Sequence, residues 1–318
     1  MLNNRKCAII GAGNVGSTTA FSLMQSGLFS ELVLIDIDRR RAEGEAADLG
    51  HALPFLSPAL IYAGDYPDLR DAALIVITAG AAQKEGESRL DLVRKNAAIF
   101  HTVVPKLCQF NTEAILLVVT NPVDILTELT RRISGFPAGR VIGSGTVLDT
   151  ARLKLLLGDH LEIDPRNVHA FIIGEHGDTE LPVYSSANIS GIDLDHFCNA
   201  DCPQCRDTDL QLLFEKTRDA AYHIIAAKGS TYYAIAEAVR RIATAILRDE
   251  NAILPISVSA DGVYGLSGLS LSLPAVLGKD GVKRVLEIPL SPQENELLHR
   301  SAERMQNVLQ ALSPLPQS

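Results

Sequence analysis

The sequence predicts an α/β protein in two parts: a doubly wound parallel sheet over residues 1–143 and an α+β domain over residues 144–318. In the first part, short apolar runs alternate with helix-like segments, as in parallel strands joined by helices. The continuous apolar runs Leu74–Thr78 and Ile115–Thr120 are typical of strands buried on both faces. Beyond Gly143 this alternation stops, so the second part is expected to follow a different plan.

The expected elements follow in chain order. In the first part, apolar runs indicate strands at 7–10, 32–35, 60–63, 74–78, 115–120 and 141–142, and the segments between them indicate helices at 17–26, 39–48, 89–110 and 123–133. The second part predicts a helix over 148–157, a strand over 168–173, a long helix over 210–247 interrupted near Gly229, and antiparallel strands over 258–263 and 285–288. A final helix is marked by Ser291 as N-cap, Pro292 at the first helical position and Glu294 completing a capping box.

The composition is ordinary for a globular protein in water: 318 residues, 47% of them hydrophobic and 21% charged. No stretch offers the roughly 18 uninterrupted apolar residues that a membrane span needs. The net charge of −9 argues against nucleic-acid binding, because surfaces that bind nucleic acid are basic. The first residues run into a strand without a secretory segment, so we expect a cytoplasmic protein.

Five cysteines, an odd number without secretory context, make a disulfide framework improbable. Cys198, Cys202 and Cys205 have the spacing of the cluster-binding triplet of radical S-adenosylmethionine enzymes, but they lie in a polar stretch far from the start of the chain. We interpret them as exposed thiols on a variable loop. Zinc binding and redox sensing are the alternatives.

A glycine motif, Gly11-x-Gly13-x-x-Gly16, lies between the first strand and the first helix and includes Val15. The glycines permit a tight turn, close approach of a pyrophosphate and packing of the helix on the sheet. Asp36 ends the second strand twenty residues later, where its carboxylate can hold the ribose hydroxyls. This Rossmann arrangement predicts NAD binding. The basic run 39–41 is the argument for NADP, although a solvated helix face explains it as well.

A histidine between two glycines, His176, follows the apolar run 168–173. Imidazole titrates near neutral pH, so this residue is a candidate for proton transfer, although such a histidine is more often an ordinary loop residue. Asp149 and Arg152 are three residues apart and share one face of the predicted helix. One interpretation is an intrahelical ion pair. The other is that Asp149 forms a hydrogen bond with His176 while Arg152 binds a substrate carboxylate.

A loop with glycine and several charged residues, 82–89, follows a buried strand and lies at the carboxyl edge of the predicted sheet, where ligands bind. Arg89 begins the next helix, so it could move into the site with a closing loop and polarise a carbonyl. Taken singly, each charge in this loop is more often simply solvated.

Five ordered motifs carry a resemblance: Gly11–Gly16, Gln83–Leu92, Thr120–Asp124, Leu148–Arg152 and Gly174–Asp178. Together they resemble the L-lactate/malate dehydrogenase family over nearly the whole chain. The resemblance implies that NAD is the cofactor, that His176 is the acid/base and that Asp149 orients it. It also implies that Arg152 binds a 2-oxo acid, that Arg89 polarises its carbonyl, that Asn121 contacts substrate or nicotinamide, and that Thr231 lines the pocket.

Gln83 bears on the choice of substrate. In malate dehydrogenases this position is typically an arginine that meets the second carboxylate of oxaloacetate. A neutral amide leaves that carboxylate unpaired in a closing pocket, whereas the methyl group of pyruvate makes no such demand. The resemblance therefore favours pyruvate and L-lactate, with malate or another 2-hydroxy acid as the alternative. A non-catalytic NAD-binding redox sensor is the alternative from another class.

The resemblance also implies a homo-oligomer, expected to be a tetramer. Bacterial relatives often bind fructose 1,6-bisphosphate between subunits through an arginine and a histidine, and the matching positions here are Lys154 and His169. Lysine keeps the charge but loses the bidentate geometry of arginine. We therefore expect activation by the bisphosphate to be retained but weakened.

Overall fold

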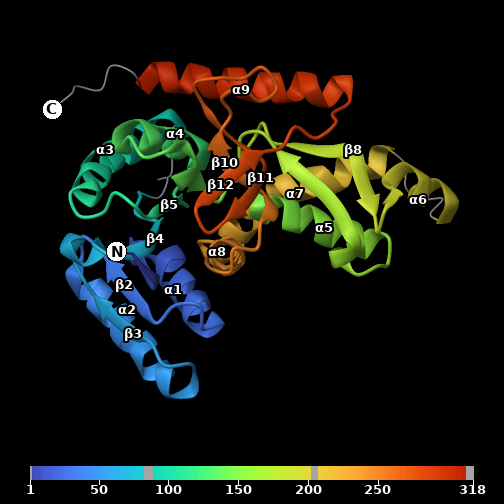
Figure 1. The fold of residues 1–318 in the computed structure, drawn as a ribbon. Coiled ribbons are helices and arrows are strands. Elements are labelled where there is room, and N and C mark those ends of the chain that lie inside the picture. The colour runs from blue at the N-terminus through green and yellow to red at the C-terminus, as the bar shows by residue number, and fades with distance from the viewer. Residues whose placement is uncertain (1, 82–88, 202–206, 313–318) are drawn as a thin grey trace.

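Figure 1 shows the computed structural model, which describes residues 2–81, 89–201 and 207–312. Within these residues a nine-stranded main sheet runs in the order β12-β11-β10-β6-β5-β4-β1-β2-β3. Its parallel part comprises β1 (Asn3–Ile10), β2 (Glu31–Ile35), β3 (Leu60–Ala63), β4 (Ala72–Ile77), β5 (Ile115–Val118) and β6 (Val141–Gly143). Its antiparallel part comprises β10 (Ala252–Ser259), β11 (Ser270–Gly278) and β12 (Gly281–Val285).

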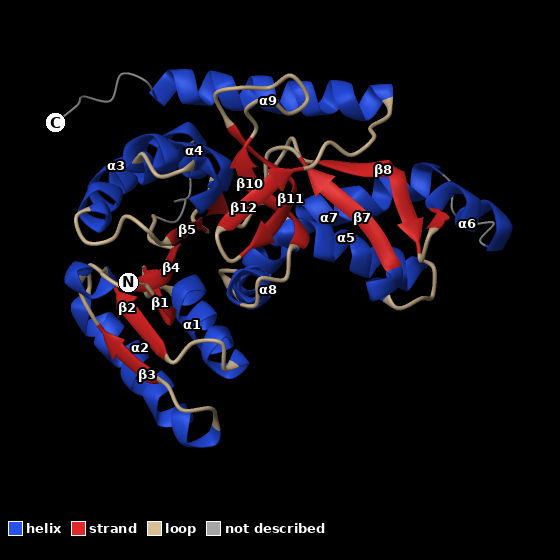
Figure 2. Cartoon of the chain, viewed as in Figure 1, coloured by secondary structure: helices blue, strands red, loops and turns tan. Residues whose placement is uncertain are grey.

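Helices cover both faces of the parallel part, as the apolar runs predicted. Successive residues of a strand point to opposite faces, so Ile9 and Ile10 of β1 belong to different cores. One core includes α1 (Asn14–Ser26), α2 (Arg39–Ala52) and α8 (Tyr233–Leu247). The other is built mainly on α3 (Arg89–Cys108), while both α3 and α4 (Val123–Ser134) contribute residues to each core. Figure 2 shows the sheet between these helices.

A small sheet lies beside the main one. It is antiparallel and contains, among the described residues, β7 (Val168–Ile173), β8 (Leu181–Ile189) and β9 (Ile192–Asp193). It packs with α5 (Val147–His160), α6 (Leu194–Asp201) and α7 (Asp207–Lys228) around a third apolar cluster. Short 3₁₀ helices lie at Leu53–Phe55, Tyr66–Leu69, Ala138–Arg140 and Pro165–Asn167. None of the described helices combines the length and the apolar composition that crossing a membrane requires.

The C-terminal helix α9 (Pro292–Leu312) crosses the top of the molecule in Figure 1. Its predicted capping box is confirmed: the backbone N–H of Ser291 donates to Oε2 of Glu294 (2.7 Å), and the backbone N–H of Glu294 donates to Oγ of Ser291 (3.2 Å). The apolar stripe with spacings of four and three is buried, so this helix packs one face on the body. The buried stripe comprises Leu298, Ala302, Met305, Leu309 and Leu312.

The second part differs from its prediction in the strands. β10 lies earlier than the predicted strand 258–263, β12 ends where the strand 285–288 was expected to begin, and β11 was not predicted. β11 alternates serine and leucine and contains Pro274, a pattern that usually indicates an exposed edge strand. Here both of its faces are buried. The long helix was predicted correctly as two helices separated at Gly229, which has a positive φ of 84°.

The α/β class with a parallel sheet in the first part of the chain is confirmed. The antiparallel strands β10–β12 extend this same sheet through pairing of β10 with β6. The two parts of the chain therefore share one sheet, and the division into domains at residue 143 stays a prediction.

Candidate active site

The glycine motif forms the turn between β1 and α1 at the carboxyl edge of the main sheet. Gly11 has a φ of 108°, and a Cβ there would lie 2.6 Å from the backbone nitrogen of Ala79. A Cβ on Gly16 would lie 1.8 Å from the carbonyl oxygen of Gly11, so these two glycines are needed for the packing of the chain itself. A Cβ on Gly13 would meet nothing within 4 Å. The open face of the turn is therefore at Gly13, where a pyrophosphate can approach the helix N-terminus.

Asp36 lies beside this turn. Its Oδ2 accepts the backbone N–H of Ala12 (2.6 Å), and its Oδ1 accepts that of Asp38 (2.9 Å). These bonds fix a partly exposed carboxylate next to the glycines, while its remaining lone pairs can still accept from ribose hydroxyls. Val15, in the first turn of α1, is half-buried at the same edge. The residues present therefore fit a dinucleotide with free ribose hydroxyls.

His176 lies in the loop that follows β7, and three segments hold this loop. Gly174 pairs with Ser272 of β11 in an isolated bridge. The backbone N–H of Glu175 donates to Oγ of Ser301 on α9 (2.8 Å). The backbone N–H of His176 donates to Oδ2 of Asp124, at the start of α4 (2.7 Å). The backbone at His176 is thus held in place independently of the contacts of the imidazole.

The imidazole of His176 is bonded to Asp149. The distance from Nδ1 to Oδ2 of Asp149 is 2.6 Å, and the other oxygen of Asp149 accepts from Nη1 of Arg152 at 2.8 Å. The Asp149 side chain is 3% exposed and that of Arg152 is 13% exposed, so this carboxylate is shared by two cations in a largely dry site. The structure therefore contains both the Asp149–Arg152 ion pair and the Asp149–His176 hydrogen bond, which the sequence had offered as alternatives.

Burial and charge act in opposite directions on these groups. Burial lowers the pKa of His176, but the charge of Asp149 and its hydrogen bond raise it more, with further contributions from Glu180 and Asp124, and the net pKa is about 9. Burial raises the pKa of Asp149, yet the charges and hydrogen bonds of His176 and Arg152 outweigh it and the net shift is downward. The arrangement favours an imidazolium against a carboxylate at neutral pH.

Two buried acids in this site were not assigned a role from the sequence. Asp124 is 1% exposed, holds the backbone of His176 and accepts from Oγ of Ser272 at 2.9 Å; burial raises its pKa to about 6. Glu180 is 6% exposed, and its Oε2 lies 3.9 Å from Nδ1 of His176. The sequence signal that could have pointed to Asp124 was an acid on an apolar helix face. For Glu180 it was a position four residues after the histidine.

The other predicted site residues fall in different places. Asn121 is exposed at the carboxyl edge, two residues before α4, and its carbonyl oxygen accepts from Nδ2 of Asn96 at 2.8 Å. Thr231 is half-buried in the short connection between α7 and α8. Arg89 is the first residue of α3, so the helix start was predicted correctly. Gln83 lies outside the described residues, as do Cys202 and Cys205.

The proposed effector residues and Cys198 lie on α5, β7 and α6. Lys154 is half-buried on α5, where burial lowers its pKa, and His169 is exposed on β7. Cys198 was expected to be an exposed thiol, and this is wrong: it is 5% exposed, because its face of α6 packs into the third apolar cluster. This burial removes one thiol of the predicted sensor from the surface.

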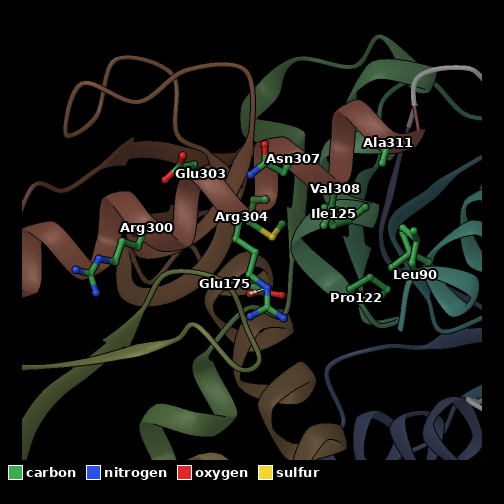
Figure 3. Close-up of a pocket in the computed structure, with 12 residues that line it drawn as sticks. Leu90, Pro122, Ile125, Glu175, Arg300, Glu303, Arg304, Asn307, Val308 and Ala311 are labelled. Atoms are coloured by element: carbon green, nitrogen blue, oxygen red, sulfur yellow. Dashed lines mark ion pairs between the residues drawn. The ribbon is translucent and has the colours of Figure 1, made fainter. Parts of the chain in front are cut away.

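A cavity of about 650 Å³ lies behind the histidine loop, between α3, α4 and α9. Figure 3 shows Arg304 of α9 pointing toward Glu175, with Leu90, Pro122 and Ile125 farther along the wall. Arg304 lies 3.9 Å from Oε2 of Glu175 and 3.3 Å from Oδ2 of Asp178. These ion pairs tie both sides of the histidine loop to the last helix.

Fold and site together define a class. The glycine turn with Asp36 and the His176–Asp149–Arg152 cluster both lie by the carboxyl edge of a parallel sheet, which is the arrangement of an NAD-dependent dehydrogenase. The family models agree: the NAD-binding domain of lactate/malate dehydrogenase matches residues 5–143, and its α/β C-terminal domain matches residues 146–313. The chain belongs to the lactate/malate dehydrogenase family.

Individual relatives are similar over nearly their whole length. An L-lactate dehydrogenase of Acetivibrio thermocellus is 50% identical over 316 residues, covering 98% of this chain and 99% of that protein. One of Priestia megaterium is 54% identical over 298 residues, covering 94% and 93%. The crystal structure of a lactate dehydrogenase from a deep-sea metagenome library of the Medee basin has a TM-score of 0.95 at 45% identity, covering 98% of this chain and all of that one.

Proposed function

We propose that this chain is an NAD-dependent L-lactate dehydrogenase that interconverts pyruvate and L-lactate. The observation that carries the proposal is the shared carboxylate of Asp149, which binds His176 at 2.6 Å and Arg152 at 2.8 Å. A proton donor and a carboxylate-binding guanidinium are thereby held side by side. These are the two groups that reduction of a 2-oxo acid requires from the protein.

His176 moves the proton. Its Nδ1 is taken by Asp149, which fixes the ring orientation and leaves Nε2 to face the substrate. With a pKa of about 9, the ring is an imidazolium at neutral pH and can donate to the carbonyl oxygen of pyruvate. In the reverse direction the neutral ring accepts the proton of the lactate hydroxyl. Asp149 stays ionised throughout and stabilises the charged ring.

In this proposal Arg152 and Arg89 contact different groups of the substrate. The guanidinium of Arg152 binds the carboxylate of pyruvate with two parallel hydrogen bonds while it keeps its contact with Asp149. Arg89, at the start of α3, polarises the reacting carbonyl. Asn121 contacts substrate or nicotinamide from the same edge, and Thr231 lines the far side of the pocket. Gly11, Gly13, Gly16, Val15 and Asp36 hold the dinucleotide, which supplies the hydride when bound.

Gln83 selects pyruvate over oxaloacetate, because a neutral amide leaves a second carboxylate without a partner in a partly dry site. We expect a higher kcat/KM for pyruvate than for oxaloacetate in the wild-type protein. Gln83→Arg should shift the ratio toward oxaloacetate by at least tenfold, which corresponds to roughly 1.4 kcal/mol. A wild-type preference for oxaloacetate would replace this proposal with a malate dehydrogenase.

The deciding experiment is NADH oxidation with pyruvate, compared between the wild type and His176→Asn. Activity in the wild type and loss of roughly 10²–10⁴ in kcat for the variant are expected for a general acid. Equal rates in the two proteins would contradict the role of His176. NADH binding measured by fluorescence should be the same in both, because His176 lies outside the glycine turn.

The proposal includes three further predictions. The protein is a cytoplasmic enzyme of fermentative glycolysis and assembles as a homotetramer, which sedimentation can check. Lys154 and His169 lie on the neighbouring elements α5 and β7, and we expect them to bind fructose 1,6-bisphosphate weakly between subunits. A pyruvate saturation curve that stays unchanged by added bisphosphate near pH 7 would contradict that effector role.

A further inference from the structure

Glu180 is a buried acid with no assigned role beside the proton-transfer pair. It follows His176 by four residues, immediately before β8, and its side chain is 2% exposed. Its Oε2 lies 3.9 Å from Nδ1 of His176, beyond hydrogen-bond distance but well within the range of strong Coulomb interaction. Its Oε1 is fully buried and has no hydrogen-bond partner among the described residues. An ionised carboxylate left in this state would be costly.

The charges around Glu180 come from two segments. Asp149 and Arg152 face it from α5, and His176 faces it from its own loop, where the backbone of Gly177 also interacts with it. Oxygen or nitrogen atoms of Asp149, His176 and Glu180 lie within 4.8 Å of one another. Two buried carboxylates thus share one imidazole, and Asp124 faces the same ring from α4. Like charges at this distance oppose each other's ionisation.

The two carboxylates are not equivalent. Asp149 has Arg152 and a direct hydrogen bond to the ring, which favour its ionised form. Glu180 lies near the charges of Arg152 and His176 but forms a hydrogen bond with neither, so it is the member of the pair that holds a proton. Burial and the charge of Asp149 raise the pKa of Glu180 to about 8, which agrees with the geometry.

We propose that Glu180 is a positioning residue for the proton on His176: a neutral carboxylic acid in the working enzyme that, once ionised, holds the imidazolium as a second carboxylate. The inference rests on the proposed function of His176. Its consequence is that pyruvate reduction persists to higher pH than the His176–Asp149 pair alone would allow. When Glu180 ionises in alkaline solution, its negative charge 3.9 Å from Nδ1 favours retention of the proton on the ring.

The test is the pH profile of kcat/KM for pyruvate in the wild type and Glu180→Gln. The amide keeps the shape of the neutral acid but cannot ionise. We expect similar activity near pH 6.5, and an alkaline limb that moves down by roughly one to two pH units, the size of a lost unit charge about 4 Å away. Glu180→Asp, which can still ionise, should keep the limb closer to that of the wild type. An unmoved limb in Glu180→Gln overturns the proposal.

Glu175→Gln is the matched control. Glu175 is also a buried glutamate next to His176, but its carboxylate accepts from Oγ1 of Thr179 and faces Arg304. Its alkaline limb should stay at the wild-type position, whatever happens to kcat. A shift equal to that of Glu180→Gln would show that any lost charge has this effect, and would overturn a specific role for Glu180.

A second measurement does not depend on turnover or on the folding of the glutamine variant. In protein labelled with ¹³C-histidine, the ring signal of His176 is the one missing from His176→Asn. We expect that signal to titrate in two steps above pH 7, where Asp124, with its pKa of about 6, is already ionised. A single one-proton step in the wild type overturns the proposal. If the wild type does not reduce pyruvate, the proposed function fails, and this titration still decides the role of Glu180.

Discussion

The two parts of the main sheet differ in how their residues contribute to the site. The parallel strands β1–β6 end in loops that present predicted site residues, such as Gly13, Asp36 and Asn121. The antiparallel strands β10–β12 present none of the predicted site residues. Their contribution is support: Ser272 of β11 pairs with Gly174 through its backbone and donates to Asp124 through its side chain.

This difference explains the serine–leucine alternation of β11. Leu271 and Leu273 pack in the main core, whereas Ser270 and Ser272 face the other way and donate to two buried acids of α4. Those acids are Glu128 and Asp124, four residues apart and therefore on one helix face. The antiparallel strand satisfies carboxylates that the parallel part needs. Within one sheet, the parallel strands thus present site residues and the antiparallel strands support them.

The largest effect is expected at Asp149, which lies at the start of α5, after the parallel strand β6. Asp149→Asn removes the charge that favours the imidazolium and permits the wrong ring tautomer, so kcat for pyruvate should fall by roughly 10²–10⁴. Steady-state NADH oxidation measures it. The control is the melting temperature with saturating NADH, which confirms that the variant still folds and binds the dinucleotide. A loss below tenfold would mean that Asp149 serves structure more than proton transfer.

The second effect is on pH dependence. Reduction of pyruvate needs protonated His176, so its kcat/KM should fall about tenfold per pH unit above about 9, whereas lactate oxidation should rise as the pH approaches that value. The folded pKa lies above the ordinary 6.5, so the resulting stabilisation is complete below pH 6.5 and is lost as the pH rises through about 9. Initial rates in both directions and chemical denaturation across this range check both statements.

The third comparison is between two glycines of one turn. Gly13→Ala should fold, because its Cβ meets nothing within 4 Å, and should raise KM for NADH by about tenfold, the equivalent of one lost charge-assisted hydrogen bond. Gly16→Ala should fail to fold stably, because its Cβ would overlap the carbonyl of Gly11. Soluble yield and KM separate the two. Equal behaviour of the variants would contradict the division of roles within the motif.

The smallest effect tests the supporting strand. Ser272→Ala removes a donor from buried Asp124 and should cost about 1–3 kcal/mol of unfolding free energy and lower kcat several-fold. Ser270→Ala is the matched control, since its partner Glu128 keeps Arg131 and Arg132 and lies away from His176. It should lower stability less and leave kcat unchanged. Urea denaturation and steady-state rates measure both, and an equal loss of kcat in the two variants would rule out a supporting role specific to Asp124.

The parallel part was predictable because its signals are local. A glycine triplet between a strand and a helix, an acid at the end of the next strand and a buried apolar run each lie within a few residues of sequence, and Asp36 was placed correctly beside the turn. The spacing of Asp149 and Arg152 predicted their contact for the same reason.

The supporting residues were not predictable because their partners are far away in the sequence. Ser272 and Asp124 are separated by 148 residues, and Ser301 and Glu175 by 126. A serine in an alternating strand predicts an exposed face, and only the fold shows that a buried acid occupies it. For Glu180 the only local signal is its position four residues after His176, and its importance depends on the direction of the His176 ring.

The attachment of the histidine loop to Ser272 and Ser301 has a consequence for the order in which the protein matures. A nascent chain that has reached residue 200 already contains all of the recognised motifs, yet neither strand β11 nor helix α9 has been made. The imidazole can be positioned only after contacts such as Glu175–Ser301, which spans 126 residues, have formed. Contacts between residues so far apart form slowly, because closing a long loop costs conformational entropy. During refolding, recovery of turnover should therefore lag behind recovery of helical signal and of NADH binding.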